Sequence, residues 1–200
     1  MAGTLVPEQK KGFQSDNEFS IHCNSREDAI RLYNQAIERL IDINHWQKYA
    51  GQMLAKFELC NKNGDPKENA VEEGDYFKID IPGPGSVAGE GYDWVQIEKI
   101  YHDDDPAHDT ALTGIRVRPV PSPCNDKNDT AHFFAEDATS SFIVKREKKT
   151  VTAEIHGRNE VPNNNTNSTV DNVRNKLVAG LAARAFSDIQ WQQLIKGLLS

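Results

Sequence analysis

The chain has 200 residues, of which 38% are hydrophobic and 26% charged, and its formal net charge is −7. This length and composition predict a globular chain that can bury a core without disulfides or metals, and they exclude a disordered chain. The acidic balance and the absence of a basic stripe argue against nucleic-acid binding, because phosphate contacts need concentrated Lys and Arg.

The sequence also bears on the cellular compartment. The first residues lack the apolar segment of a signal peptide, and no stretch approaches the roughly 18 apolar residues of a membrane span. Cys23, Cys60 and Cys124 are far apart and form no CxxC pair, which fits reduced thiols. We therefore expect a cytoplasmic protein without a membrane span.

The first part of the chain predicts a strand and then a helix. Residues 1–16 are polar and are expected to form a mobile tail, so that a single domain covers residues 17–200. Alternating apolar residues predict a strand over 18–23. Ser25 then caps a helix that ends near residues 43–46, in which apolar residues recur at spacings of three and four.

The middle of the chain switches to a period of two, which is typical of strands. An acidic stretch over 102–113 and an Asn-rich stretch over 159–168 are expected to be loops. The expected strands cover residues 52–60, 75–81, 92–101, 114–120, 132–134, 140–146 and 151–160.

The C-terminal part predicts a long helix whose apolar face starts at Val170. Ser187 and Gln190 match a capping box, which predicts a break near Phe186 and a second short helix to Leu199.

This order of elements predicts an α+β fold. A long amphipathic helix must bury its apolar face, and the sheet is the partner large enough to cover it. We expect a curved antiparallel sheet of about six to seven strands wrapped on the C-terminal helix, a helix-grip arrangement, with the first helix closing one end. A barrel or sandwich with the helices outside remains an alternative.

The element order over residues 18–199 resembles the START/polyketide-cyclase-like (SRPBCC, helix-grip) superfamily. The resemblance implies a cavity between the sheet and the long helix. The segments GDYFKIDIPGPG, GYDWVQIE and HGRNEVPN are also similar to segments of uncharacterised bacterial proteins, a likeness that implies no particular activity.

A glycine- and proline-rich loop over 82–91 lies between two expected strands and leads to Tyr92 and Trp94. It matches neither GxGxxG nor a Walker A loop, because the Lys-Ser/Thr pair and a following helix are missing. The loop is either a bent connection or the rim of a pocket. In a pocket, Tyr92 and Trp94 would contact a ligand; otherwise Trp94 is a core residue.

Charged residues supply the other candidates. Arg116 and Arg118 share a strand face, where they either hold an anionic ligand or form ion pairs on a solvated surface. In the acidic loop, His102 and His108 match neither an EF-hand nor a zinc motif, so we expect no metal and no cofactor.

The segment HGRNE is the densest polar cluster, and strand alternation places His156, Arg158 and Glu160 on one face. If this face lines a cavity, His156 serves as general acid or base, and Arg158 and Asn159 bind the ligand. Glu160 and His132 are further catalytic candidates. If the face meets solvent, the same residues are ordinary surface groups.

Three functions follow from these patterns. The favoured one is binding of a small hydrophobic or amphipathic ligand in the sheet–helix cavity, because it needs only the fold and a few polar anchors. The second is an acid/base enzyme of cyclase-like or hydrolase-like type that uses His156 and Arg158. The third is a protein-interaction module or homodimer that docks through the sheet or through one face of the last helix, which carries Ile189, Trp191, Leu194, Ile195 and Leu198.

Overall fold

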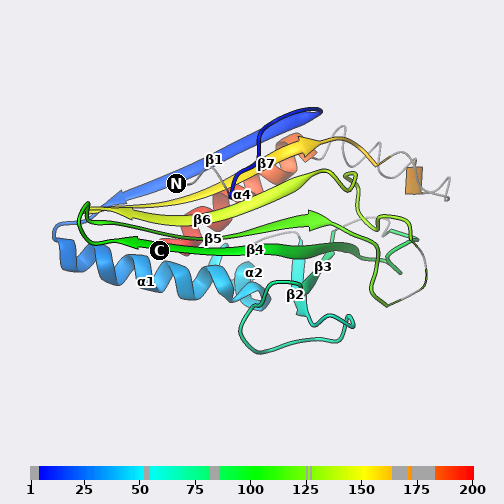
Figure 1. Cartoon of the computed structure of the whole chain (residues 1–200), viewed down its shortest axis with the longest axis horizontal. Helices are drawn as coiled ribbons and strands as arrows, with labels where there is room; N and C mark the ends of the chain where they lie inside the picture. Colours follow the sequence, from blue (N-terminus) through cyan, green and yellow to red (C-terminus); the bar gives the residue numbers. More distant parts are fainter. Residues whose placement is uncertain are drawn as a thin grey trace.

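The computed structural model describes residues 5–51, 55–81, 86–124, 126, 128–163, 171, 172 and 183–200. Figure 1 shows its elements in chain order: β1 Phe13–His22, α1 Arg26–Ile41, the 3₁₀ turn η2 Ile43–His45, α2 Trp46–Tyr49, β2 Lys56–Cys60, β3 Tyr76–Asp80, β4 Asp93–Asp105, β5 Thr110–Pro119, β6 Thr139–Glu147, β7 Thr150–Glu160 and α4 Ala183–Leu198.

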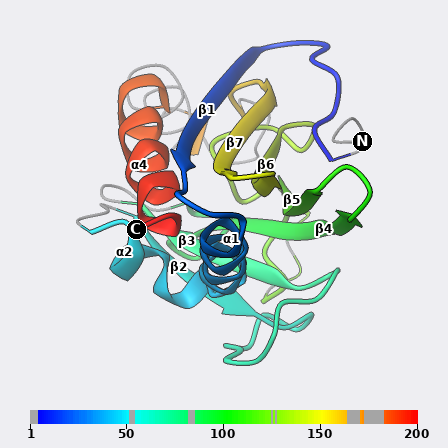
Figure 2. The same ribbon diagram turned by 90° about the vertical axis from the view of Figure 1, so that its left-hand side faces the viewer.

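The described strands form one antiparallel sheet of seven strands in the order β1-β7-β6-β5-β4-β3-β2. Strands β2 to β7 follow one another as neighbours, whereas β1 pairs with β7 at the far edge. Figure 2 shows the curved sheet around α1 and α4, which lie on the same side of it. We call this side the inner face and the opposite side the outer face. The sheet is open and both helices lie on one face of it, which confirms the helix-grip prediction. The alternative of a barrel or sandwich with the helices outside is wrong.

Helix α1 forms as the sequence predicts. The Ser25 side chain accepts a hydrogen bond from the Asp28 N–H (3.0 Å), which satisfies one of the free donors of the first turn. The helix ends at Asp42, where the backbone leaves helical geometry, and α2 follows as a separate turn. The apolar stripe of α1 is buried against the sheet and comprises Ala29, Tyr33, Ala36 and Leu40.

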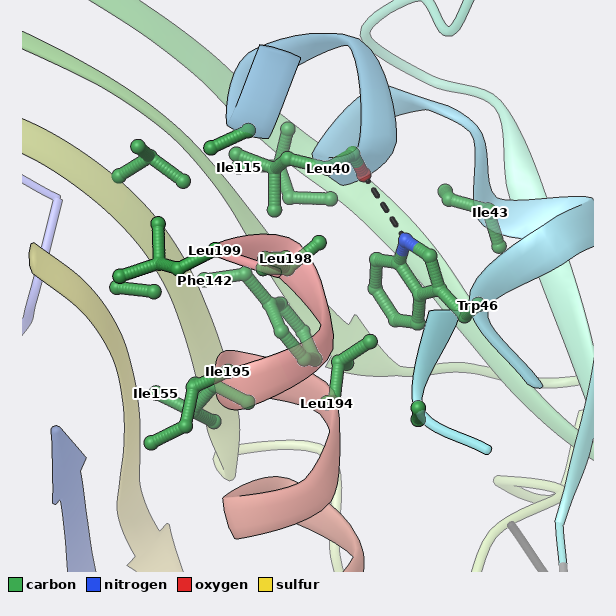
Figure 3. Packing of buried hydrophobic residues seen from close by; sticks show 14 of the residues in the cluster. Leu40, Ile43, Trp46, Ile115, Phe142, Ile155, Leu194, Ile195, Leu198 and Leu199 are labelled. Carbon is green, nitrogen blue, oxygen red and sulfur yellow. Dashed lines mark hydrogen bonds between the residues drawn. The ribbon is translucent and has the colours of Figure 1, made fainter. Parts of the chain in front are cut away.

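An aromatic cluster around Trp46 fills the core between the sheet and the C-terminal half of α4 (Figure 3). The Trp46 ring lies 5.3 Å from Phe57, 5.8 Å from Phe77 and 4.8 Å from Phe142, measured between ring centroids. Its indole N–H donates to the carbonyl of Leu40 (3.1 Å), so the buried polar atom is satisfied. This part of the interior is therefore closely packed by the protein's own side chains.

Helix α4 runs without interruption through Phe186 and Ser187, so the predicted break is wrong. Instead of completing a capping box, the Gln190 side-chain oxygen accepts the N–H of Ala55 (3.1 Å). The apolar face predicted over residues 170–182 lies outside the described residues.

The predicted docking face of the last helix belongs to the core. Leu194, Ile195 and Leu198 are fully buried, and Trp191 packs on the Phe57 and Phe142 rings. Of the five residues of this predicted face, only Ile189 is largely exposed (61%). Sequence periodicity identified an apolar face correctly, but its partner is the sheet of the same chain.

Two other boundaries differ from the prediction. Strand β4 reaches Asp105 and β5 starts at Thr110, so most of the expected acidic loop is a hairpin. The expected strand over 132–134 is absent from the described structure, where Phe134 makes only an isolated bridge to Pro162.

The N-terminal segment also differs from the prediction, because Leu5 packs on the outer face of the sheet. Leu5 is fully buried, and the Ser141 hydroxyl donates to its carbonyl (2.8 Å). Gly114 leaves room for the Leu5 side chain, since an added Cβ would strike Leu5. Strand β1 then starts at Phe13, five residues before the expected strand at residue 18. Among the described helices, none is long and apolar enough to cross a bilayer.

Candidate functional site

Beyond the aromatic cluster, the inner face carries small side chains. The strand register aligns Ser15 with Gly157, Gly157 with Ser140, and Ser140 with Val117. We call these four residues the small-residue row. They lie on the inner face because core residues stand two positions away along each central strand, and side chains of a strand alternate. Those neighbours are Ile115, Phe142 and Ile155.

Glu160 joins this row because of an irregularity at the end of β7. Asn159 has a left-handed backbone (φ 57°), and the β1–β7 register shifts between Phe13 and Ser15. As a result, the Glu160 carboxyl carbon lies 2.8 Å from where a Cβ of Gly157 would stand, and Ser15 Oγ donates to its carboxylate (3.4 Å). Strict alternation had placed Glu160 on the same face as His156 and Arg158, and this prediction is wrong.

Asn159 is held by the N-terminal segment. Its side-chain oxygen accepts the N–H groups of Lys10 (2.8 Å) and Lys11 (3.2 Å), and its own N–H donates to the Gln9 side chain (2.8 Å). Asparagine tolerates the left-handed conformation better than most residues. In the described structure its side chain therefore fixes the bulge and the incoming chain.

Two more polar residues of the inner face are buried. Asn17 accepts a hydrogen bond from the Gln192 side chain of α4 (3.0 Å). Asp93 opens β4 with no exposed surface and stands opposite Ile79 of β3. Buried polar groups are normally hydrogen-bonded, so the side-chain oxygens of Asn17 and Asp93 are part of the internal hydrogen bonding of the fold. The inner face thus combines small side chains with a few acceptor oxygens.

His156 and Arg158 lie on the outer face, away from α4. The two ring nitrogens of His156 contact Asp16 (2.5 Å) and Glu154 (3.1 Å), and Arg158 also binds Asp16 (2.6 Å). The hydrogen bond to Glu154 raises the pKa of His156 against the effect of burial, and Asp16 adds to the rise. Lys145 completes the group by pairing with Glu154.

The carboxylates of this group are shifted in the opposite direction. Burial opposes ionisation, but hydrogen bonds from His156 and Lys145 hold the pKa of Glu154 below its ordinary value. Burial likewise acts against ionised Asp16, and His156 and Arg158 outweigh it to lower that pKa. Both His156 nitrogens are therefore engaged with carboxylates that favour the imidazolium, which is a structural arrangement that ties β1 to β7.

The remaining outer-face candidates also have protein partners. Arg116 and Arg118 share the Glu98 carboxylate at 2.9 and 3.2 Å, which is the ion-pair alternative of the sequence prediction. Trp94 is 3% exposed, and its indole donates to the Gly89 carbonyl (3.3 Å). It centres a second, smaller cluster with Cys60, Ala88, Val120 and Ala131.

His132 lies apart from His156, in the connection between β5 and β6. Its Nδ1 accepts the N–H of Phe134 (2.9 Å), and its ring stacks on Phe133 at 4.2 Å. The two histidines of the acidic hairpin contact residues of the hairpin itself. His108 pairs with Asp105, and His102 contacts Thr113. Within the described residues no cluster of His, Cys, Asp and Glu could hold a metal ion.

Sequence reasoning did not find a contact that closes the glycine-rich loop. Asp171 is buried, and its two carboxylate oxygens accept the N–H groups of Val87 (2.8 Å) and Ala88 (3.1 Å). A lone aspartate in a polar stretch carries no signal for such a distant pairing. Residues 82–85, which include Gly83 and Gly85 of the predicted rim, lie outside the described residues.

Tyr92 lines a groove of about 470 Å³ at the β2 edge of the sheet. The Lys78 ammonium sits 4.9 Å from the centre of its ring. This groove is separate from the inner face, because it follows the edge strand between α2 and the turn at residues 66–68.

No protein-family model matches the chain, and no curated protein matches it. Among solved structures, it is similar to protein Ms6760 of Mycobacterium smegmatis (TM-score 0.43, 13% identity, 98% of this chain and 97% of that one). It is also similar to a START superfamily protein of the same organism (TM-score 0.38, 10% identity, 94% and 97% covered).

A third similar structure is the di-domain ARO/CYC BexL of the BE-7585A biosynthetic pathway (TM-score 0.39, 12% identity). The match covers 94% of this chain and 46% of BexL, so the chain spans about half of that protein. The helix-grip fold itself follows from the strand order and from the helices packed on the inner face.

Proposed function

We propose that the protein binds one small apolar or amphipathic molecule between the inner face of its sheet and the terminal helix, over the small-residue row. The contrast between the two parts of the inner face carries this proposal. Trp46, Phe57 and Phe142 fill one part, whereas hydroxyl groups and a glycine line the other. Small-molecule sites are typically concave and apolar, with a few polar groups that orient the ligand.

The polar groups suggest how the ligand is oriented. Glu160 and Asn17 present oxygen acceptors near the row, so the polar end of the ligand is expected to be a hydrogen-bond donor. We place this binding in the cytoplasm, since Cys23, Cys60 and Cys124 are free thiols.

The test fills the proposed space with a larger side chain. Ser140→Phe adds a ring to the small-residue row, and Ser20→Phe makes the same change at an exposed position of β1. The probe is Nile red, a neutral fluorophore that brightens in apolar surroundings. We expect the wild type and Ser20→Phe to bind it equally and Ser140→Phe to lose at least tenfold in affinity, which is about 1.4 kcal/mol.

The stability of the variants completes the test. Filling an empty space leaves the melting temperature nearly unchanged, whereas overpacking a full one costs about 1–3 kcal/mol. Equal Nile red binding by both variants would refute the proposal. So would a fall in melting temperature of Ser140→Phe alone, because the row would then already be packed.

A further inference from the structure

The groove at the β2 edge is the strongest feature that the proposed function does not use. Strand β2 ends the sheet, and an edge strand presents backbone N–H and C=O groups that no neighbouring strand satisfies. Native proteins usually cover such groups. Here the cover comes from side chains and a turn, and it is incomplete.

Both ends of the β2 edge are closed. The N–H of Leu59 donates to the Asn44 side chain (2.7 Å), and its carbonyl accepts the N–H of Lys67 (2.8 Å). Just before β2, the N–H of Ala55 donates to Gln190 of α4 (3.1 Å). These three bonds point away from β3, so residues 55 and 59 direct their backbone groups outward.

Phe57 lies midway between these closed positions. Backbone groups of alternate residues in an antiparallel strand point to the same edge, so the N–H and C=O of Phe57 also point outward. Throughout the described part of the chain, neither group has a hydrogen-bond partner. Phe57 lines the groove, which provides room beside it.

We propose that this groove binds an extended peptide segment, one residue of which pairs with Phe57 as a single rung of an additional strand. A residue in extended conformation presents its N–H and C=O on one side with the spacing that Phe57 requires. The closed positions at Ala55 and Leu59 limit the pairing to one residue.

The flanking side chains define the surroundings of the bound segment. The side chain of the paired residue projects to the same side as Phe57, where Gln47 of α2 lines the groove. The residues before and after it project to the outer side, where Lys56 and Tyr92 line the groove. In the described structure Lys56 forms no ion pair although Asp80 is its cross-strand neighbour, so an acidic flanking residue suits this side.

Amide hydrogen exchange tests the open rung without any ligand. We expect the Phe57 amide of the full chain to exchange at least tenfold faster than that of Leu59, because only the Leu59 amide has an acceptor. Equal protection of the two amides would mean that Phe57 is already bonded and would overturn the proposal.

Nuclear magnetic resonance titration then tests the occupant. The probe is the capped peptide acetyl-Thr-Val-Glu-Val-Thr-amide, and its control is the same peptide with every backbone nitrogen methylated. We expect the first peptide to shift and protect the Phe57 amide. The methylated peptide should bind at least roughly fivefold more weakly, the equivalent of one hydrogen bond of about 1 kcal/mol. Equal binding of both peptides, or no shift at Phe57 with either, would overturn the proposal.

Paired variants locate the binding. Gln47→Trp fills the groove from α2, whereas Lys48→Trp places the same side chain on the neighbouring exposed residue, which does not line the groove. Gln47→Trp should abolish the peptide-induced shifts and Lys48→Trp should leave them unchanged. Retained binding by Gln47→Trp would contradict the groove as the site. Neither variant touches the small-residue row, so this test is independent of Nile red binding.

Discussion

Replacing Gly197 by alanine should destabilise the protein, although the same change stabilises most helices. Inside a helix, alanine is favoured over glycine by about 1 kcal/mol. At Gly197 of α4, however, a Cβ would lie 2.5 Å from the carbonyl carbon of Tyr49 and 2.9 Å from the nitrogen of Ala50. The obstacle is backbone, which cannot rotate away as a side chain can.

The size of the effect follows from this geometry. Bringing the atoms to a normal separation of about 3.5 Å requires α4 and the end of α2 to move apart by roughly 1 Å. Leu194 and Leu198, which are fully buried beside Trp46, would then lose contacts. Overpacking of this severity costs about 3 kcal/mol, so the net loss is about 2 kcal/mol after the gain in helix propensity.

Urea unfolding and calorimetry measure this loss. For a domain of 200 residues, about 2 kcal/mol corresponds to a fall of roughly 4–8 °C in melting temperature. Lys196→Ala is the control, because Lys196 is the exposed preceding residue and should change stability by less than about 0.5 kcal/mol. A Gly197→Ala protein as stable as the wild type, or more stable, would refute the close approach of α2 and α4.

Three further changes test separate contacts. Arg39 donates to the carbonyls of Gly197 (3.1 Å) and Leu198, so Arg39→Met should cost about 1–2 kcal/mol in urea unfolding; an unchanged midpoint would deny this cap. His156→Gln should lose most stability below pH 6.5, the ordinary pKa, with the difference shrinking as pH rises through the elevated pKa. A difference in melting temperature that grows with pH would contradict the ion pairs. Leu5→Ala should cost about 2–3 kcal/mol in urea unfolding, and a neutral result would mean that the N-terminal segment does not pack.

Local sequence patterns predicted the helices and strands whose structure depends on residues close together in the sequence. Helix α1 was predictable because a cap, acidic first-turn residues and an apolar stripe agree along it. The inner side of β7 was predictable because Val151, Ala153 and Ile155 alternate with polar residues. Both features depend on neighbours within a few positions of the sequence.

The predictions were wrong where contacts between residues far apart in the sequence determine the local structure. Glu160 lies on the inner face because the left-handed Asn159, held by Lys10 and Lys11, interrupts the alternation. The break predicted at Ser187 is wrong because α4 continues through this residue, and the Gln190 side chain binds the distant Ala55 N–H. None of these long-range contacts leaves a periodic signal in the sequence.

Native mass spectrometry of the purified protein, beside its mass after denaturation, tests the proposed binding most directly. The wild type should carry the extra mass of one small molecule, as purified or after incubation with Nile red, and should lose it on denaturation. Under the same conditions, Ser140→Phe should carry the small molecule on a much smaller fraction of chains, and Ser20→Phe should behave as the wild type. A bare wild-type chain of 22.4 kDa both before and after incubation would contradict ligand binding over the small-residue row.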